Sequence, residues 1–359
     1  MPYSLAVLGG GPAGASAAIT AARLGIDVVL IEAGKFPRHK VCGEFISAEA
    51  LDLLAGLLSS TALIHEAPRI RESRVFVDGR KLALSVDPPA ASVSRHRLDF
   101  ALWEAAGKAG VTRLERARAL WVKREDDFVI GLGDREVHAQ AVIDATGRWS
   151  NLHPQPINRD GARWIGCKAH FLESNPASSC DLYFFEGGYC GVQRINDISV
   201  NVSAMVRADV ARDLAGVLAQ SAELRERSGG WSPATVPVST AHLNFHPPRT
   251  SLDGILLCGD AAAFLDPFAG DGISMALHTG RLAACAVAEF LSGSCPLDVA
   301  INSYAQSHRE LIQPALRSAA RLRRLIAMPR ALRAGALSLL DIPIVGSWAV
   351  RKTRVRVAV

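Results

Sequence analysis

The stretch LAVLGGGPAGASAAITAARLGIDVVLIE, residues 5–32, decides the fold of this chain. Its first four residues are apolar and predict a short buried strand, and residues 9–14 then match the pattern G-x-G-x-x-G. An alanine-rich segment from Ala13 to Leu24 predicts a slim helix, which ends at Gly25. Asp27 to Ile31 predict a second buried strand, of the kind found in a parallel sheet. Strand, glycine turn, helix and strand in this order indicate an α/β fold.

The glycines of this turn each have a chemical reason. Gly9 permits the tight turn out of the strand, and Gly14 lets the helix lie close to the sheet. Gly11 has no side chain, so a pyrophosphate can approach the backbone there. The helix start after Pro12, from Ala13 on, offers free N–H groups and a partial positive charge to the phosphates. The turn therefore predicts a dinucleotide-binding site.

The end of the second strand supplies the next part of this site. Glu32 stands 18 residues beyond Gly14, where a carboxylate can accept hydrogen bonds from both ribose hydroxyls of an adenosine. Ala33 and Arg38 follow as further candidate contacts to the cofactor. A glycine turn in an unrelated α/β protein is the alternative, and the position of Glu32 favours the dinucleotide.

Two later segments indicate which dinucleotide binds. They are VIDATG, residues 142–147, and LCGDAAAFLDPFAGDGI, residues 257–273. Together with the glycine turn, in this order and spacing, they resemble the flavoprotein family of aromatic hydroxylases, flavin-dependent halogenases and geranylgeranyl reductases. The resemblance implies that the cofactor is FAD, held by a Rossmann-type domain beside a second domain for the substrate.

The same resemblance assigns roles to single residues. Asp260, which follows Gly259, would hydrogen-bond the ribityl chain of FAD, and Pro267 would sit beside the flavin ring. A helix starting near Gly272 would stabilise the negative charge of reduced flavin with its positive end. The resemblance adds further cofactor contacts at Gly270, Gly272, Ile273, Arg95 (in RHRLD, residues 95–99) and, through its backbone, Ala119.

The loop KVCGEFIS, residues 40–47, should carry the chemistry. It resembles the C-G-E/G-x-x-S segment of geranylgeranyl reductases, which passes near the flavin ring. This implies that Cys42 is a proton donor or a substrate contact and that Glu44 is a second candidate acid; the alternative for Cys42 is a small buried hydrophobic residue. Tyr189 remains from the aromatic substrate segment of these reductases, whose tryptophan and proline are absent, and is a candidate substrate contact.

The resemblance implies an FAD-dependent oxidoreductase but leaves the reaction open. We predict a monooxygenase that acts on a hydrophobic or aromatic small molecule, with reduced flavin activating O2. The alternatives are a reductase of C=C bonds, a halogenase, and a non-catalytic nucleotide-binding or membrane-partner module. The halogenase motif W-x-W-x-I-P is absent, and Lys168 is more simply a surface or ion-paired lysine than a halogenase-type lysine. With a single dinucleotide fingerprint, electrons must come from transiently bound NAD(P)H or from a reductase partner.

The organisation of the chain indicates two lobes, as its 359 residues suggest. Alternating segments between Trp164 and Met205 predict an antiparallel sheet, followed by a helical connector over Val210–Ser228 and a strand over Thr235–Ser239. The predicted domains are a discontinuous FAD-binding domain of 1–70, 93–155 and 245–300, a substrate domain of 71–92 and 156–244, and a basic helical C-terminal segment of 301–359.

The net charge of +5 is unevenly spread. Eleven Lys and Arg residues against two acidic residues lie between Arg309 and Val359, a net +9, so the rest of the chain carries −4. This basic segment is either a solvated helix face or a contact to an anionic membrane surface.

The location and ligand classes follow from composition and spacing. The seven cysteines form no CxxC pair, and the N-terminus shows no leader, so we expect a cytoplasmic protein, with membrane association left open. We expect a hydrophobic small-molecule substrate, no metal site and no nucleic-acid partner. His242 and His246 are four residues apart but have no third ligand beside them in the sequence.

Overall fold

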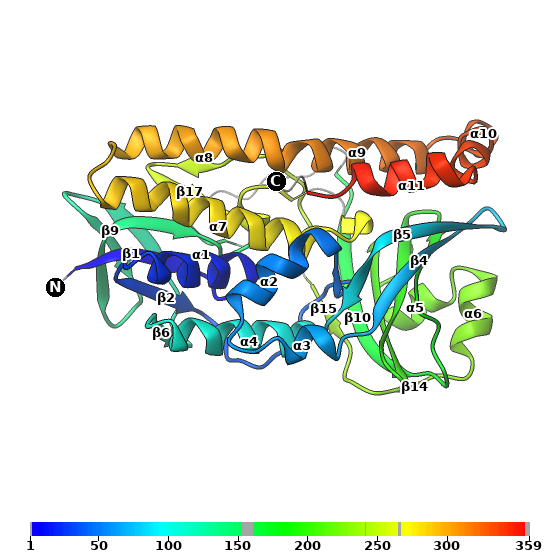
Figure 1. Cartoon of the computed structure of the whole chain (residues 1–359). Helices are drawn as coiled ribbons and strands as arrows, with labels where there is room; N and C mark the ends of the chain where they lie inside the picture. Colours follow the sequence, from blue (N-terminus) through cyan, green and yellow to red (C-terminus); the bar gives the residue numbers. More distant parts are fainter. Residues whose placement is uncertain (1, 149, 153–160, 241, 265–266, 356–359) are drawn as a thin grey trace.

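The computed structural model describes residues 2–148, 150–152, 161–240, 242–264 and 267–355, which form two β-sheets and a series of helices (Figure 1). The first sheet has the strand order β16-β17-β9-β1-β2-β6, with β8 paired antiparallel to β9 and β7 paired antiparallel to β8. β17, β9, β1, β2 and β6 are parallel neighbours. The strands of this sheet are β1 (Tyr3–Leu8), β2 (Val28–Glu32), β6 (Thr112–Glu115), β7 (Trp121–Arg124), β8 (Phe128–Gly131), β9 (Glu136–Asp144), β16 (Ser251–Leu252) and β17 (Ile255–Leu257).

Helices cover this sheet and bury its apolar strands. All five residues of β2 are buried, as the continuous apolar run predicts for a parallel strand covered on both faces. α1 packs against α7 and α4, and α8 lies along α7 (Figure 1). The helices next to this sheet are α1 (Pro12–Arg23), α2 (Leu51–Leu57), α3 (Ala62–His65), α4 (Arg95–Lys108), α7 (Gly272–Leu291) and α8 (Leu297–Leu311).

The contact between α1 and α7 joins segments that are far apart in the sequence. Ser16 Oγ donates a hydrogen bond of 2.7 Å to the carbonyl oxygen of Leu277. A Cβ at Gly280 would collide with the backbone of Ala13, so only glycine allows the two helices to approach this closely. The α/β fold class inferred from the sequence is therefore confirmed, with its first unit completed by residues near the other end of the chain.

The second sheet has the strand order β14-β10-β13-β12-β11-β4-β5-β3, with β15 also paired to β10. Its neighbours are antiparallel, as predicted, apart from the parallel pair β11 and β4. It lies at the other end of the molecule from β1 and β2 (Figure 1). Its strands are β3 (Phe45–Ile46), β4 (Arg69–Val77), β5 (Arg80–Ser92), β10 (Trp164–Leu172), β11 (Ser179–Phe185), β12 (Gly188–Asn196), β13 (Ser199–Arg207), β14 (Ser232–Pro233) and β15 (Val238–Ser239).

Two expectations in this part of the chain need correction. The helical connector over Val210–Ser228 is two short helices, α5 (Leu214–Leu218) and α6 (Ala222–Ser228), because Asp213 and Ser221 each cap a new helix start with their side chains. The strand over Thr235–Ser239 shrinks to β15, since pairing with β10 is interrupted between the short strands β14 and β15. The domain limits stay a prediction, and residues 153–160 at one of them lie outside the described residues.

The C-terminal segment is helical, as expected. α9 (Gln313–Ile326) continues the direction of α8, and α10 (Arg330–Leu340) and α11 (Pro343–Lys352) fold back beside it over β4 and β5 (Figure 1). α11 packs directly on β5. A Cβ at Gly346 would lie only 2.6 Å from the carbonyl oxygen of Leu340 and 2.7 Å from Leu84 Cδ2, so this helix is close-packed on both.

Candidate functional site

The glycine turn joins the carboxyl end of β1 to α1, the edge at which parallel sheets bind ligands. Gly9 has a φ of +98°, a left-handed conformation that favours glycine, and a Cβ on Gly14 would collide with the carbonyl oxygen of Gly9. A Cβ on Gly11, in contrast, would approach only the Arg95 guanidinium among the described atoms, at 3.7 Å. Packing within the protein thus does not require glycine at position 11, whereas close approach of a ligand would.

Glu32 lies beside this turn at the carboxyl end of β2. Its carboxylate accepts hydrogen bonds from the backbone N–H of Gly10 at 2.8 Å and of Gly34 at 2.6 Å, and pairs with Arg38 at 2.8 Å. Burial would raise the pKa of Glu32, but Arg38 and the two N–H groups together lower it. The predicted ribose acceptor is therefore held ionised next to the glycine turn, and the predicted contacts Ala33 and Arg38 lie there too.

The segment around Asp260 lies against the same turn. Gly259 has a φ of +60°, and a Cβ there would come within 2.8 Å of Ala13 Cβ at the start of α1. This places the short 3-10 helix η2 (Gly259–Ala261) directly beside the proposed pyrophosphate site. Asp260 is 38% exposed on its side chain and pairs with Arg148 at 3.4 Å. Two motifs that are distant in the sequence thus meet at one site.

The start of α7 forms the next wall. Gly270 has a φ of +74°, and a Cβ there would lie 3.3 Å from the ring of Phe45, whereas a Cβ at Gly272 would meet nothing described within 4 Å. Ile273 is buried in the core below. Pro267 begins the 3-10 helix η3 (Pro267–Ala269), but its side chain lies outside the described part of the structure, so its predicted place beside the ring stays a prediction.

The end of α11 is fastened to this same segment. The backbone N–H of Val355 donates to Asp271 Oδ2 at 2.9 Å, and Arg354 lies 3.7 Å from Asp271 Oδ1. Arg354 also donates to the carbonyl oxygen of Ala269 at 3.1 Å. Burial raises the pKa of Asp271, although Arg354 opposes the shift. The C-terminal helices are thus part of the construction of this site.

Arg95 links the glycine turn to the loop around Cys42. Its guanidinium makes a bidentate pair with Asp99, at 2.6 and 2.7 Å, and lies beside both Gly11 and the side chain of Cys42. Burial would lower the pKa of Arg95, but Asp99 raises it overall, so the charge is permanent. The predicted cofactor contact at Arg95 therefore has the position that it needs.

Cys42 itself is a half-buried free thiol. Asn201 Nδ2 donates to the carbonyl oxygen of Cys42 at 3.0 Å, and the N–H of Glu44 donates to Cys42 Sγ at 3.3 Å. The Glu44 carbonyl in turn accepts from Gln193 Nε2 at 3.1 Å and from Val93 N at 3.0 Å. The second sheet therefore holds this loop in place through side chains that reach its backbone.

Glu44 is fully buried and has a φ of +60°. Its carboxylate accepts from Lys168 Nζ, from His170 Nε2 at 2.8 Å and from the N–H of Arg95 at 2.8 Å. Burial would raise the pKa of Glu44, but His170 and Lys168 lower it overall. An ionised carboxylate accepts hydrogen bonds and has no proton to give, so the geometry favours Glu44 as the anchor of the loop over the role of acid.

The sequence analysis missed most of the side chains that hold this loop. His170, Asn201 and Gln193 lie opposite one another on β10, β13 and β12, so they form one polar row across the sheet. Lys168 is ion-paired, as one of the alternatives had it, but it is buried and not on the surface. The alternation of polar residues along GCKAH, residues 166–170, was the available signal, and only the strand register shows where this face points.

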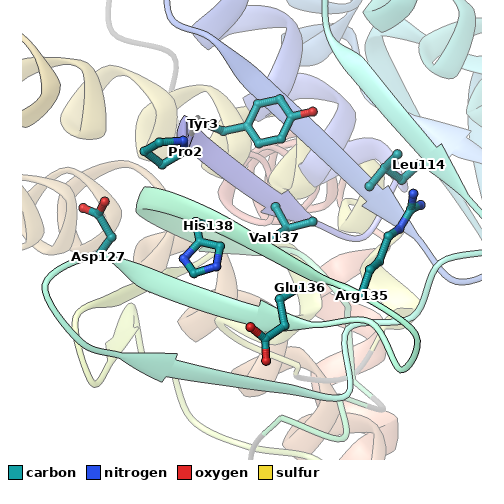
Figure 2. A pocket seen from close by; sticks show the side chains of 8 residues that line it. All are labelled: Pro2, Tyr3, Leu114, Asp127, Arg135, Glu136, Val137 and His138. Carbon is teal, nitrogen blue, oxygen red and sulfur yellow. The ribbon is translucent and has the colours of Figure 1, made fainter.

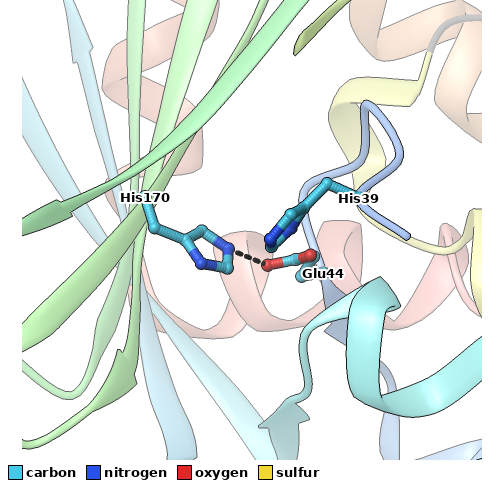
Figure 3. A group of neighbouring side chains, drawn as sticks. All are labelled: His39, Glu44 and His170. Atoms are coloured by element: carbon cyan, nitrogen blue, oxygen red, sulfur yellow. Dashed lines mark hydrogen bonds and ion pairs between the residues drawn. The ribbon is translucent and has the colours of Figure 1, made fainter. Parts of the chain in front are cut away.

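Glu44 and His170, together with His39 from the loop before Cys42, also meet the geometry of a metal site. Figure 3 shows these three side chains converging, and their ligand atoms all lie within 4.8 Å of one another. Lys168 already occupies one carboxylate oxygen of Glu44, and a metal cation would stand against its ammonium group. We therefore interpret the cluster as a buried ion-pair network.

The predicted adenine contact at Ala119 lies near Glu32. The N–H of Ala117 donates to the carbonyl oxygen of Glu32 at 2.9 Å, which fixes this connection to the end of β2. The carbonyl oxygen of Ala119 accepts from Asn151 Nδ2 at 3.0 Å. The backbone of Ala119 is thus placed at the site, and its contact to a base stays a prediction.

An apolar cavity of about 110 Å³ begins where Phe45 and Gly270 meet. One wall is the second sheet, a second wall is the Phe268–Gly270 segment, and the remaining side is formed by the C-terminal helices. Tyr189 is not among the lining residues: its ring packs behind Phe184 and Phe268, with centroids 5.5 and 6.4 Å away. The residues lining the cavity from the helices are Leu322, Leu325, Ile326, Leu337, Leu340, Ala349, Val350, Thr353 and Arg354.

A wider hollow of about 540 Å³ lies elsewhere on the first sheet (Figure 2). It is lined by Tyr3 at the start of β1 and by Glu136 at the start of β9, with charged side chains around it. The glycine turn is at the opposite, carboxyl end of β1. This hollow therefore belongs to the edge of a parallel sheet that ordinarily binds no nucleotide.

Comparison with known proteins agrees with this geometry. The family model described as FAD dependent oxidoreductase matches residues 4–148. The digeranylgeranylglycerophospholipid reductase 2 of Methanopyrus kandleri is 30% identical over 320 residues, 80% of this chain and 78% of that protein. The menaquinone reductase of Mycobacterium tuberculosis is 29% identical over 310 residues, 77% of this chain and 74% of that protein.

The solved structure of the flavin-dependent brominase Bmp2 has the same fold, with a TM-score of 0.82 at 20% identity over 98% of this chain and 93% of that one. The glycine turn, the acid at the end of β2 and the start of α7 thus converge in a chain that is similar to these two reductases over most of its length. The chain belongs to the family of FAD-dependent oxidoreductases.

Proposed function

We propose that this enzyme reduces carbon–carbon double bonds in a polyprenyl chain. The observation that carries the proposal is the apolar cavity, which ends at Phe45 and Gly270 beside the start of α7. The names of the two relatives support the substrate class, because geranylgeranyl groups and menaquinone side chains are both unsaturated isoprenoids. An apolar chain would enter this cavity without leaving polar groups unpaired.

The residues of the site fit FAD. A Cβ at Gly272 would meet nothing described within 4 Å, and one at Gly11 would meet only the Arg95 guanidinium, at 3.7 Å. Both residues stand at a helix start, where the first backbone N–H groups have no partner within the helix. Glu32 is ionised at the adenosine end. Bound and reduced, FAD supplies the hydride for a C=C reduction, while the protein positions the substrate and excludes water.

Reduction of a double bond also needs a proton, and we assign Cys42 Sγ to hold it. The sulfur accepts from the N–H of Glu44, which leaves its own S–H free to donate. Asn201 fixes the backbone of Cys42, and Glu44 is fixed in turn by Lys168 and His170. This part of the second sheet thus acts as a rigid support for the thiol.

The electron donor is proposed to be NAD(P)H, docking transiently, or a reductase partner. The sequence has a single glycine fingerprint, which we assign to FAD, so NAD(P)H has no second fingerprint of its own at which to bind tightly. Anaerobic mixing of the oxidised enzyme with NADH or NADPH separates the two. Bleaching of the flavin absorbance by either nucleotide supports direct reduction, and its absence supports a partner.

The monooxygenase favoured in the sequence analysis and the halogenase remain the competing reactions. The likeness to the brominase is at 20% identity and supports the fold alone. The non-catalytic module is excluded, because the chain is a member of an enzyme family. The cavity adds a reason to prefer C=C reduction, since most of its lining is apolar, with aliphatic side chains beside Phe45, Phe184 and Phe268, which suits an apolar chain.

A single-turnover experiment tests the proposed reaction. The holoenzyme is reduced without oxygen and mixed with a geranylgeranyl lipid, and flavin reoxidation and product mass are followed. We expect reoxidation and a product heavier by two hydrogens, because one reduced flavin carries the two electrons that one double bond needs. Reoxidation only in the presence of O2, with one oxygen atom in the product, would establish the monooxygenase, and a halide-dependent product would establish the halogenase.

A further inference from the structure

The outer surface of α10 and α11 has an unusual concentration of exposed apolar side chains. Ile344 is 80% exposed and Trp348 is 56% exposed. Elsewhere in the described chain, exposed large hydrophobic side chains are spread over separate elements, with Leu172 and Ile198 as neighbours. The exposed residues of this surface, which we call the apolar tip, are Met328, Leu332, Leu339, Ile342, Ile344 and Trp348.

The inner surfaces of the same two helices are apolar as well. Leu337 and Leu340 of α10, and Ala349 and Val350 of α11, line the cavity. A helix that is apolar on both sides is usually buried on both sides. Here the second sheet and the cavity cover the inner side, whereas no described part of the chain covers the exposed apolar side chains of the outer side.

Most charges next to the apolar tip are basic; within the described residues 324–352, Asp341 at the end of α10 is the acidic exception. Arg324 and Arg330 lie exposed at the turn between α9 and α10, and Arg351 and Lys352 lie exposed at the end of α11. Lys352 stands over the ring of Trp348 at 5.6 Å. A tryptophan with basic residues around exposed aliphatic side chains matches the interface of a bilayer with anionic lipids.

We propose that the apolar tip docks on the surface of an anionic lipid bilayer. Apolar insertion and charge attraction together provide the two signals that stable, reversible membrane binding requires. No helix within the described residues is both long and apolar enough to cross a bilayer, so contact is confined to one leaflet. If the proposed function also holds, α10 and α11 lie between the leaflet and the cavity, and a polyprenyl chain passes from the leaflet into the cavity.

Vesicle flotation of the holoenzyme tests the docking itself, without any enzymatic readout. We expect binding to vesicles of phosphatidylcholine with phosphatidylglycerol, weaker binding in high salt, and little binding to phosphatidylcholine alone. Ile344→Glu should weaken partitioning at least about tenfold, because it removes an inserted aliphatic side chain. Arg351→Gln and Lys352→Gln should each weaken it about fivefold on anionic vesicles.

Matched controls keep this test specific. Ile198→Glu changes an apolar side chain that is 63% exposed in the turn between β12 and β13, and Arg212→Gln removes an exposed charge just before α5; both should bind like the wild type. Flavin absorbance and thermal unfolding verify that each variant is folded. Absence of binding to anionic vesicles, or binding that Ile344→Glu leaves unchanged, overturns the proposal.

One further outcome counts against the proposal, and another separates it from the proposed function. A dimer that Ile344→Glu dissociates, together with no vesicle binding, would assign the tip to a second copy of this chain. The single-turnover assay in detergent remains independent, since it presents the substrate without a bilayer. Failed C=C reduction with intact vesicle binding would overturn the reductase and leave the docking surface standing.

Discussion

Replacing Lys168 by Met should lower the free energy of unfolding by about 3 kcal/mol. Lys168 and Glu44 are both buried and form an ion pair, so removing the lysine leaves a buried carboxylate without the charge of its partner. Breaking such a pair from one side costs about 3–5 kcal/mol. His170 and the N–H of Arg95 still bind the carboxylate in the variant, which places the expected loss at the lower end of this range.

Equilibrium urea denaturation measures this loss, at a fixed excess of FAD so that cofactor binding adds equally to every variant. Glu44→Gln, which leaves the lysine unpaired, and the double variant complete a thermodynamic cycle. The double variant should recover part of the loss, because neither charge then remains buried alone. Lys81→Met changes an exposed lysine on the second sheet and should stay within about 0.5 kcal/mol of the wild type.

The pH dependence gives a second readout of the same pair. The pKa of Glu44 is lowered in the folded protein, so its stabilising effect is present above the unfolded pKa of about 4.3 and is lost as the pH falls through the folded pKa. Without Lys168 the folded pKa rises, and the loss should begin at a higher pH. A Lys168→Met variant within about 1 kcal/mol of the wild type, with the same acid limb, would refute the reasoning.

Other predictions concern the glycine turn, a buried histidine and the thiol. Gly11→Ala should weaken FAD binding while leaving the apoprotein's melting temperature nearly unchanged, whereas Gly14→Ala should lower that temperature because its Cβ meets the Gly9 carbonyl; flavin titration and calorimetry of both apoproteins distinguish them. Burial lowers the pKa of His308 to about 4, so stability should fall by about 3 kcal/mol as the pH drops from about 6.5 to 4, and His308→Phe should remove this slope in urea titrations at each pH. Cys42→Ser should keep the flavin and the fold but slow single-turnover reduction at least about tenfold; unchanged reoxidation would exclude Cys42 as the proton donor.

The cofactor half of the site could be predicted because its signals are local. The glycines, Glu32 and the Asp260 segment each have a backbone or charge requirement that a short stretch of sequence reveals. Their meeting in space then follows from the parallel order of β1, β2, β9 and β17. The α/β class and the antiparallel second sheet were predictable for the same reason, since each rests on the period of apolar residues.

The support of Cys42 could not be predicted, because it depends on register between strands. His170, Asn201 and Gln193 alternate with apolar neighbours, a pattern that also describes a sheet with one face in water. Only their alignment across β10, β13 and β12 turns three isolated polar residues into one row beneath the loop. The apolar tip could not be predicted either, because the sequence does not show which face of the basic C-terminal helices leaves Ile344 and Trp348 exposed.

The packing of α1 on α7 has a consequence for biosynthesis. The Ala13 backbone and Gly280, which fit together without a gap, are separated by most of the chain. At a translation rate of about 5–20 residues per second, roughly 13 to 50 seconds pass between their emergence from the ribosome. During that interval the alanine-rich first helix lacks its partner, so the nascent chain should depend on chaperones that shield it, and FAD can be captured in full only after the later helix arrives.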